Sequence, residues 1–250
     1  MRFTVLASSS RANGYLLHSQ SEALVIEAGV SLFNVKKALD FQLDIIKGCI
    51  VTHRHLDHAR YIRQYADAGI DIFGPEDIFE APHHRNRPIL PGKGYKVGNF
   101  QIIPFGVQHD VLCYGCLIDH PATGRILFLT DTYLCEYSFP NLNHIIIEAN
   151  YADDILEENI LQGIEHPSKR ERLLTSHMEI KTTKAVLMAQ DISVVQNIIL
   201  THLSDRNSDE ARFVDDIKAL TGKPVYAAKA EMTRKPCVTQ VQMLLPDDAF

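Results

Sequence analysis

Four side chains that bind metals through nitrogen or oxygen lie within six residues, in the stretch His-Arg-His-Leu-Asp-His from His53 to His58. In an extended segment His53 and His55 point the same way, because side chains alternate along a strand. Asp57 and His58 would then open a helix and face a second ion beside the first. Imidazole and carboxylate without thiolate suit zinc, iron or manganese. The alternative is a histidine-rich surface loop, but a buried strand before the stretch and a helix after it argue against that.

Three more candidate ligands follow apolar strands further along the chain. They are His109 in Gln-His-Asp, Asp131 in Thr-Asp-Thr and His202 in Thr-His-Leu-Ser. Taken singly, each histidine would more often be a packed or surface residue, and the aspartate more often a cap. Their joint occurrence with the stretch from His53 to His58 is what indicates a metal site.

The stretch resembles the His-x-His-x-Asp-His signature of the metallo-β-lactamase superfamily, and the resemblance extends over nearly the whole chain. It implies a four-layer αββα sandwich of the α/β class and two divalent transition metals, zinc first, with manganese and iron as alternatives. The resemblance assigns one metal to His53, His55 and His109, a second metal to Asp57, His58 and His202, and a bridging role to Asp131.

Two residues outside that ligand set narrow the class of enzyme. Glu148 ends a buried apolar strand, and His177 follows Thr-Ser just before a predicted helix. This order resembles the phosphodiesterase branch that includes the tRNA 3′-processing endonuclease, where the matching Glu and His form an acid pair that binds no metal. The alternative is that Glu148 makes a structural ion pair and His177 has no role, since perturbed acid–base pairs mark function only statistically.

Several stretches are similar to the YycJ-type (WalJ-type) family, which is associated with 5′-to-3′ exonuclease action on DNA. They are Leu6–Ser10, Asn13, His53–His58, Ile147–Tyr151, Lys169–Arg172 with Ser176–Met178, and Thr201–Ser204. The chain departs from the family in three places. Ser9 and Ala12 replace glycines, Glu27 replaces an aspartate, and Met-Glu-Ile-Lys follows His177. These departures leave the metal ligands intact and the substrate open.

The predicted reaction is hydrolysis of a phosphodiester by a hydroxide that bridges two metals, which lower the pKa of its water. Asp57 would orient this nucleophile besides binding metal. His177, oriented and kept protonated by Glu148, would protonate the leaving alkoxide. The predicted catalytic residues are therefore Asp57, His177 and Glu148.

Substrate contacts are expected from the first loop and from basic side chains. The stretch from Ala81 to His109 contains no Asp or Glu but carries several basic residues. A solvated loop or helix face is the equally weighted alternative for all of these basic residues. The predicted substrate-binding residues are Ser8, Asn13, Arg85, Arg87, Lys169, Arg170 and Arg172.

The elements that must position these residues alternate between strands and helices, in one domain over residues 1–250. Most candidate ligands come at or just after the end of an apolar strand, so rigid strands would deliver them to one rim. Strands are predicted at Arg2–Ala7, Tyr15–His18, Ala23–Glu27, Cys49–Thr52, Phe100–Val107, Cys113–Asp119, Arg125–Thr130, His144–Ala149 and Val194–Thr201. Helices are predicted at Ser31–Leu39, Asp57–Asp67, Thr182–Ala189 and Asp209–Leu220, and a turn at Ala12–Gly14.

The composition of the chain excludes several classes of protein. The net charge of −6 argues against a protein that coats nucleic acid through a broad basic face. No apolar run approaches the roughly 20 residues that cross a bilayer, and the N-terminus lacks a signal-peptide pattern. Five scattered cysteines indicate free thiols in a reducing compartment, so a cytoplasmic location is expected, with nucleic acid as the partner and the oligomeric state open.

Other functions remain open on the same set of residues. One alternative is a phosphodiesterase for a small, nucleotide-like molecule, which would need no basic track. Another is a di-iron redox or sensor protein that hydrolyses nothing. A thioester or lactam hydrolase would leave Glu148 and His177 without a role, and a non-catalytic scaffold would not need a complete ligand set.

Overall fold

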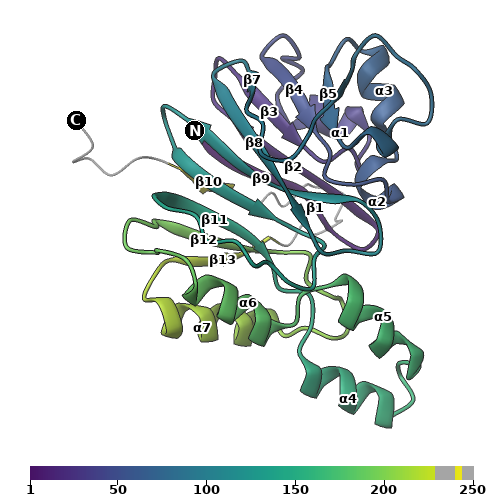
Figure 1. Ribbon diagram of the computed structural model, residues 1–250, viewed down its shortest axis with the longest axis vertical. Helices are drawn as coiled ribbons and strands as arrows, with labels where there is room; N and C mark the ends of the chain where they lie inside the picture. Colours follow the sequence, from purple (N-terminus) through teal and green to yellow (C-terminus); the bar gives the residue numbers. More distant parts are fainter. Residues whose placement is uncertain (229–239, 244–250) are drawn as a thin grey trace.

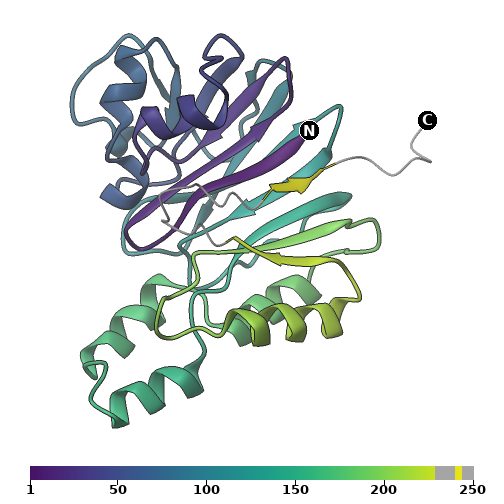
Figure 2. The ribbon, with the colours of Figure 1, turned by 180° about the vertical axis from the view of Figure 1, so that it is seen from behind.

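The computed structural model describes residues 1–228 and 240–243, which form two seven-stranded sheets packed face to face (Figure 1). The order of the first sheet is β14 (Gln240–Gln242), β1 (Arg2–Ser9), β2 (Ala12–His18), β3 (Ala23–Ile26), β4 (Ile46–Ile50), β5 (Ile72–Gly74) and β6 (Asn86–Pro88). The order of the second sheet is β13 (Val225–Ala227), β12 (Asn197–Thr201), β11 (Leu142–Glu148), β10 (Gly124–Leu129), β9 (Cys113–His120), β8 (Phe100–Val107) and β7 (Tyr95–Val97). Seen from behind, β14 pairs antiparallel with β1 (Figure 2).

Helices cover the outer face of each sheet. Beside the first sheet lie α1 (Leu32–Ala38), α2 (Leu56–Ala59), α3 (Ile62–Asp67) and the short 3₁₀ helix η1 (Glu76–Ile78). Beside the second lie α6 (Ile180–Met188) and α7 (Glu210–Thr221), while α4 (Asp153–Leu161) and α5 (Ser168–Ser176) extend away from the sandwich (Figure 1). The predicted four-layer αββα arrangement is confirmed.

Both faces of each sheet are buried, which explains why many strands read as unbroken apolar runs. The layer between the sheets contains large side chains from both, among them Phe3, Tyr15 and Phe128. On the outer face of the second sheet, Leu200 packs in one cluster with Phe213 of α7. Burying one such side chain contributes about 1.5–3 kcal/mol, so the layers are held mainly by this packing.

The direction of the strands decides where the polar residues gather. Strands β10, β11, β12 and β13 run parallel to one another, as do β3, β4, β5 and β6. Parallel strands end at the same edge of a sheet, and loops at that edge are where open α/β sheets bind ligands. His53 follows β4, Asp131 follows β10 and His202 follows β12, so the topology brings distant residues to one rim.

The structure corrects two local predictions. The helix expected over Asp57–Asp67 is broken into α2 and α3, because the Tyr61 amide donates to the Ala28 carbonyl at 2.9 Å rather than continuing the helix. The turn expected at Ala12–Gly14 lies earlier, and residues 12–14 begin β2, where Ala12 pairs with Ser9. Helices α4 and α5, and the short strands β5, β6, β7, β13 and β14, were not predicted as elements.

The cysteines within the described ranges, Cys49, Cys113, Cys116 and Cys135, are buried free thiols, and Cys237 lies outside those ranges. Within residues 1–228 and 240–243, no helix has both the length and the hydrophobicity needed to cross a membrane.

Candidate metal centre

Three histidines from two segments form one group of potential ligands. The ligand atoms of His53, His55 and His109 all lie within 4.8 Å of one another. Among these atoms, His109 Nε2 lies 3.3 Å from His55 Nδ1. His53 and His55 come from the loop after β4, and His109 follows β8. We call these three residues the first triad.

A second group lies beside it. The ligand atoms of Asp57, His58 and His202 also lie within 4.8 Å of one another, with Asp57 Oδ2 at 3.3 Å from His58 Nε2 and 3.8 Å from His202 Nε2. We call these residues the second triad. Asp131 joins the two groups, since it clusters with His53 and His58 and its Oδ2 lies 2.9 Å from His58 Nε2. All seven predicted ligands therefore meet in one cage.

Strained backbone positions two of the ligands. Asp131 and His202 have φ of 49° and 55°, in the left-handed region that non-glycine residues rarely adopt. Such a conformation costs of order 1–3 kcal/mol and persists where the surrounding structure imposes it, typically at functional sites. Each residue comes at the end of a buried strand, β10 or β12, so packing of the second sheet holds both side chains at the cage.

A close backbone approach positions the motif itself. A Cβ on Gly29 would lie 1.7 Å from the carbonyl oxygen of Asp57, so the turn after β3 contacts the metal motif directly. Only glycine allows a backbone to approach that closely. The Ala28 amide also donates to the His58 carbonyl at 2.7 Å, which fixes the second triad against the first sheet.

The buried carboxylate of Glu27 contacts one histidine of each triad, His53 through Thr52 and His58 directly. Thr52 Oγ1 donates to Glu27 Oε1 at 2.6 Å and lies 3.0 Å from His53 Nδ1. The same Glu27 oxygen lies 3.3 Å from His58 Nδ1. Partners of this kind fix the orientation of metal-binding imidazoles. Sequence reasoning noted Glu27 only as a departure from a family pattern, although an acidic residue between a buried strand and Ala-Gly was the available signal.

Side-chain amides and a hydroxyl support the second triad further. Asn13 Nδ2 lies 2.8 Å from His58 Nε2 and 3.3 Å from Asp57 Oδ2. Asn150 Nδ2 donates to the His202 carbonyl at 2.8 Å, and Ser8 Oγ accepts from the His202 amide at 2.9 Å. We expected substrate contacts from Ser8 and Asn13. Both residues are hydrogen-bonded to residues of the cage, and Asn13 is fully buried. Their contacts with substrate stay a prediction.

The residues present fit a divalent metal. His53 Nε2 and His202 Nε2 are buried and have no hydrogen-bond partner among the described residues. Buried polar atoms almost always have a partner, and a metal would supply one for both. His53 Nδ1 already faces Thr52, which leaves Nε2 as the ligand atom. A donor set of imidazole and carboxylate suits zinc, manganese or iron.

The triads differ in charge. Burial and the neighbouring imidazoles hold the pKa of His53 well below its usual value, and burial lowers that of His109. Burial also disfavours the charged form of His202, but the carboxylates of Asp131, Asp57 and Glu148 together outweigh it and raise the His202 pKa to about 10. The pKa of His58 is raised by Asp131 and Glu27 against the same burial. The raised pKa values favour protonated His58 and His202 when no metal is bound. A metal that binds the second triad must therefore release these protons.

Glu148 and His177 form a pair directly beside the cage. His177 Nδ1 lies 2.7 Å from Glu148 Oε1, and the His177 ring stacks on that of His202 at 5.1 Å. Glu148 is fully buried at the end of β11, and its Oε2 accepts from the Thr132 amide at 3.1 Å. Burial would raise the pKa of Glu148, but His177, by its charge and its hydrogen bond, lowers it. The carboxylate is therefore charged and orients the histidine.

One side of the cage is open. The side chains of His55, Asp57 and His177 are 34%, 21% and 12% exposed. The side chains of the other cage residues, which are His53, His58, His109, Asp131 and His202, are buried. Access from solvent is thus past His55, Asp57 and His177, so the histidine of the acid pair lies at the open side, with Glu148 buried behind it.

Comparison with solved structures identifies the architecture. YhfI of Bacillus subtilis, a metallo-β-lactamase-fold protein, superposes with a TM-score of 0.67 at 18% identity, over 96% of this chain and 99% of that one. The short form of human tRNase Z superposes with a TM-score of 0.62 at 15% identity, over 98% of this chain and 100% of that one. The chain has the metallo-β-lactamase fold.

The sequence of this metallo-β-lactamase-fold chain is similar to two curated exodeoxyribonucleases. YycJ of Bacillus anthracis is 25% identical over 235 residues, covering 84% of this chain and 85% of the relative. WalJ of Streptococcus pneumoniae is 23% identical over 233 residues, covering 83% of each. No protein-family model matches the chain. The resemblance expected from the motifs is confirmed.

Most of the predicted basic contacts are engaged elsewhere on the fold. Arg85 and Arg87 both pair with Asp71, at 3.2 and 3.0 Å, because β6 lies beside β5 and the residue preceding it. On α5, Lys169 pairs with Glu165, and Arg170 with Asp153 at 2.8 Å. Arg172 is exposed and makes no ion pair within the described part of the chain. Both arginines of the acid-free stretch thus share one carboxylate from outside it.

Proposed function

We propose that this protein is a metal-dependent phosphodiester hydrolase that acts as a nuclease on DNA, with 5′-to-3′ exonuclease activity. The observation that carries the proposal is the contact of 2.7 Å between His177 Nδ1 and Glu148 Oε1, beside the cage of seven ligands. Glu148 and His177 also cluster with Asp131 and His202, and we assign the pair to acid catalysis because the two triads and Asp131 already provide seven ligands. A histidine paired with a carboxylate at that position suits an alkoxide leaving group, which a nucleic-acid chain provides. The two exodeoxyribonucleases that resemble the chain over more than four fifths of its length support the choice of DNA.

The cage would hold two divalent metals, zinc first and manganese or iron as alternatives. His53, His55 and His109 would bind one, Asp57, His58 and His202 the other, and Asp131 both. When bound, two such metals supply Lewis acidity at the scissile phosphate and lower the pKa of a water.

The chain's own residues complete the chemistry. Glu148 holds a proton on His177 Nδ1 and stabilises the imidazolium, while hydrogen bonds from Thr132 and His202 fix Glu148. His177 Nε2 then donates its proton to the oxygen of the departing sugar. Asp57, partly exposed at the entrance, accepts a hydrogen bond from the attacking water and orients it. General-acid help of this kind is typically worth about 10²–10⁴-fold in rate.

Product mapping tests the proposal. Single- and double-stranded DNA and RNA, labelled at either end, are incubated with protein supplied with zinc or manganese. We expect DNA to be shortened progressively from its 5′ end, releasing nucleotides. Internal cuts would show an endonuclease rather than an exonuclease, and cleavage of RNA alone would show that RNA, not DNA, is the substrate. No cleavage with either metal would refute the nuclease function.

A small-molecule phosphodiesterase is the second candidate, favoured by the pairing of Arg85, Arg87, Lys169 and Arg170 with carboxylates. Without a free basic track, the site would not need a long substrate. Turnover that does not change with oligonucleotide length, and changes little with salt, would support this candidate over the nuclease.

A further inference from the structure

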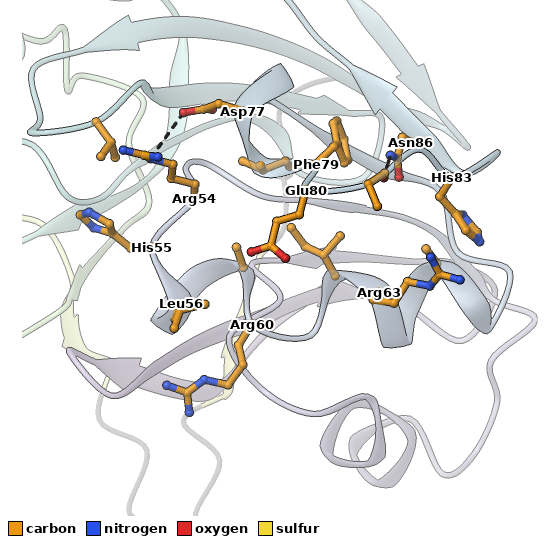
Figure 3. Close-up of a pocket in the computed structure, with 16 residues that line it drawn as sticks. Arg54, His55, Leu56, Arg60, Arg63, Asp77, Phe79, Glu80, His83 and Asn86 are labelled. Carbon is orange, nitrogen blue, oxygen red and sulfur yellow. Dashed lines mark hydrogen bonds and ion pairs between the residues drawn. The ribbon is translucent and has the colours of Figure 1, made fainter.

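A cavity of about 580 Å³ opens beside the exposed ligand His55 (Figure 3). Residues of α2, of α3 and of the segment 77–86 line it. Its volume falls within the range of about 300–1,000 Å³ typical of small-molecule sites. Because His55 belongs to both the cage and the cavity, whatever occupies the cavity lies next to the metal centre.

Part of the cavity wall is apolar. Leu56 stands between two ligands of the cage, yet 61% of its surface is exposed. A single exposed leucine needs no explanation, but this one lines the cavity together with Ala59, Ile62 and Phe79. A wall of that kind at an active-site entrance suits the face of a flat ring.

The same cavity carries charges that are only partly paired. Glu80 lies in the middle of the view in Figure 3, between Arg54 and Arg63. Its carboxylate makes no ion pair or hydrogen bond within the described residues, and neither does the Arg60 guanidinium. Arg54 Nε lies 3.8 Å from Asp77, too long for a strong bond, while Arg63 is held by Asp67. The cavity thus offers one free acceptor and two available cations.

We propose that this cavity is a subsite for the nucleotide next to the scissile phosphate, and that it selects a base with an exocyclic amino group. This inference rests on the proposed nuclease function and specifies its substrate. An ionised carboxylate only accepts hydrogen bonds, so Glu80 receives them from the amino group of guanine, adenine or cytosine. Thymine has carbonyl oxygens at its exocyclic positions and offers only its ring N3–H as a donor, so it lacks the amino group that Glu80 would recognise. Leu56 and Phe79 contact the ring, and Arg54 and Arg60 contact flanking phosphates.

Binding of mononucleotides is the first test. Metal-loaded protein is titrated by calorimetry with dGMP, dAMP, dCMP, dTMP and deoxyribose 5-phosphate. We expect the three amino-bearing nucleotides to bind at least about tenfold more tightly than dTMP, since a hydrogen bond to a charged group is worth that much. Glu80→Gln should remove this difference. Leu56→Ser, checked for full metal content, should weaken all four nucleotides but not the base-free sugar phosphate.

Cleavage is the second test. Single-stranded DNA oligonucleotides that differ in one base next to the cleaved bond give kcat/KM for each base, with Glu157→Gln on the exposed face of α4 as the matched control. The wild type and the control should favour guanine, adenine and cytosine over thymine, and Glu80→Gln should not. DNA cleavage without base preference, or a preference that Glu80→Gln retains, would refute the subsite and leave the nuclease intact. Selective mononucleotide binding without any cleavage of nucleic acid would refute the nuclease and leave the base-selective site intact.

Discussion

The two triads of the cage are equally complete, but they differ in their surroundings. The two histidines of the second triad are buried and have raised pKa values, and Glu27, Asn13 and Asn150 support the triad, while its Asp57 is 21% exposed. The first triad has one exposed member, His55, and its buried histidine, His53, has a lowered pKa. The second triad therefore favours positive charge in its place, whereas burial opposes a charge on His53 in the first triad, whose His55 is the most exposed of the seven ligands, at 34%. We infer that the second triad anchors a metal and that the first faces the substrate.

The largest expected effect comes from the residue that the triads share. Asp131→Ala removes a carboxylate that lies 2.9 Å from His58 and 3.5 Å from His202. Those buried imidazoles would then lack their main partner, so at least one of two metals should be lost and hydrolysis should fall to background. Elemental analysis after gel filtration measures the metal. Asp215→Ala, exposed on α7, is the control, and full occupancy in the Asp131 variant would exclude a bridging role.

The next effect separates the acid pair from both triads. His177→Ala should keep both metals and lose about 10²–10⁴-fold in the hydrolysis of DNA, because an alkoxide departs poorly without a proton. A nitrophenolate is stable as an anion, so an aryl phosphodiester should be hydrolysed nearly as well as by the wild type. Glu148→Gln should show the same selectivity more weakly.

Rates on both substrates, with metal content measured on the same sample, decide this prediction. If His177→Ala loses metal, or slows both substrates equally, the acid assignment fails.

A smaller effect tests whether the triads are supported independently. Asn150→Ala removes an amide 3.0 Å from His202 Nδ1, while Thr52→Val removes the hydroxyl 3.0 Å from His53 Nδ1. Loss of such partners typically costs about 10–100-fold in metal affinity. Competition titration with a chelator should resolve two affinities. Asn150→Ala should weaken the tighter one and Thr52→Val mainly the weaker, and a reversed pattern would contradict the anchoring role of the second triad.

The smallest effect concerns the arginines far from the open side. Arg85→Ala with Arg87→Ala breaks two partly exposed ion pairs with Asp71. Such pairs contribute about 0–1 kcal/mol, so urea unfolding should change little. Because both guanidinium groups are engaged, the salt dependence of DNA binding should stay as in the wild type, whereas Arg54→Ala with Arg60→Ala should flatten it. A flattened slope in the variant that lacks Arg85 and Arg87 would instead support the prediction that the acid-free stretch contacts substrate.

The cage could be anticipated from the sequence because its ligands can be recognised from the residues next to them. His53, Asp131 and His202 each follow a recognisable apolar strand, and strand ends converge at one edge whatever the loops do. The supporting residues could not be anticipated in the same way. Asn13 contacts His58 from 45 positions away, and nothing in its own neighbourhood indicates that contact.

The ion pairs of the basic residues could not be anticipated for a related reason, and their substrate contacts stay a prediction. In a sequence, an arginine side chain cannot be told to be paired until its partner is known. Here the partner is Asp71, which lies just before β5 and outside the acid-free stretch. The break between α2 and α3 likewise depends on a carbonyl of Ala28, a residue from another element. Helical periodicity alone cannot reveal such a contact. Pairing across elements was thus the information that the sequence did not carry.

The spacing of the ligands has a consequence for how the protein acquires its native state. Four donors lie within the six residues from His53 to His58, so they stay close even in an unfolded chain, whereas His109, Asp131 and His202 join them only after both sheets pack. A metal that binds the unfolded chain reduces the net stabilisation of the folded one. We therefore expect refolding to depend on the order of addition. Zinc supplied after the sheets have formed completes the cage, while zinc present from the start occupies the short stretch first and delays assembly.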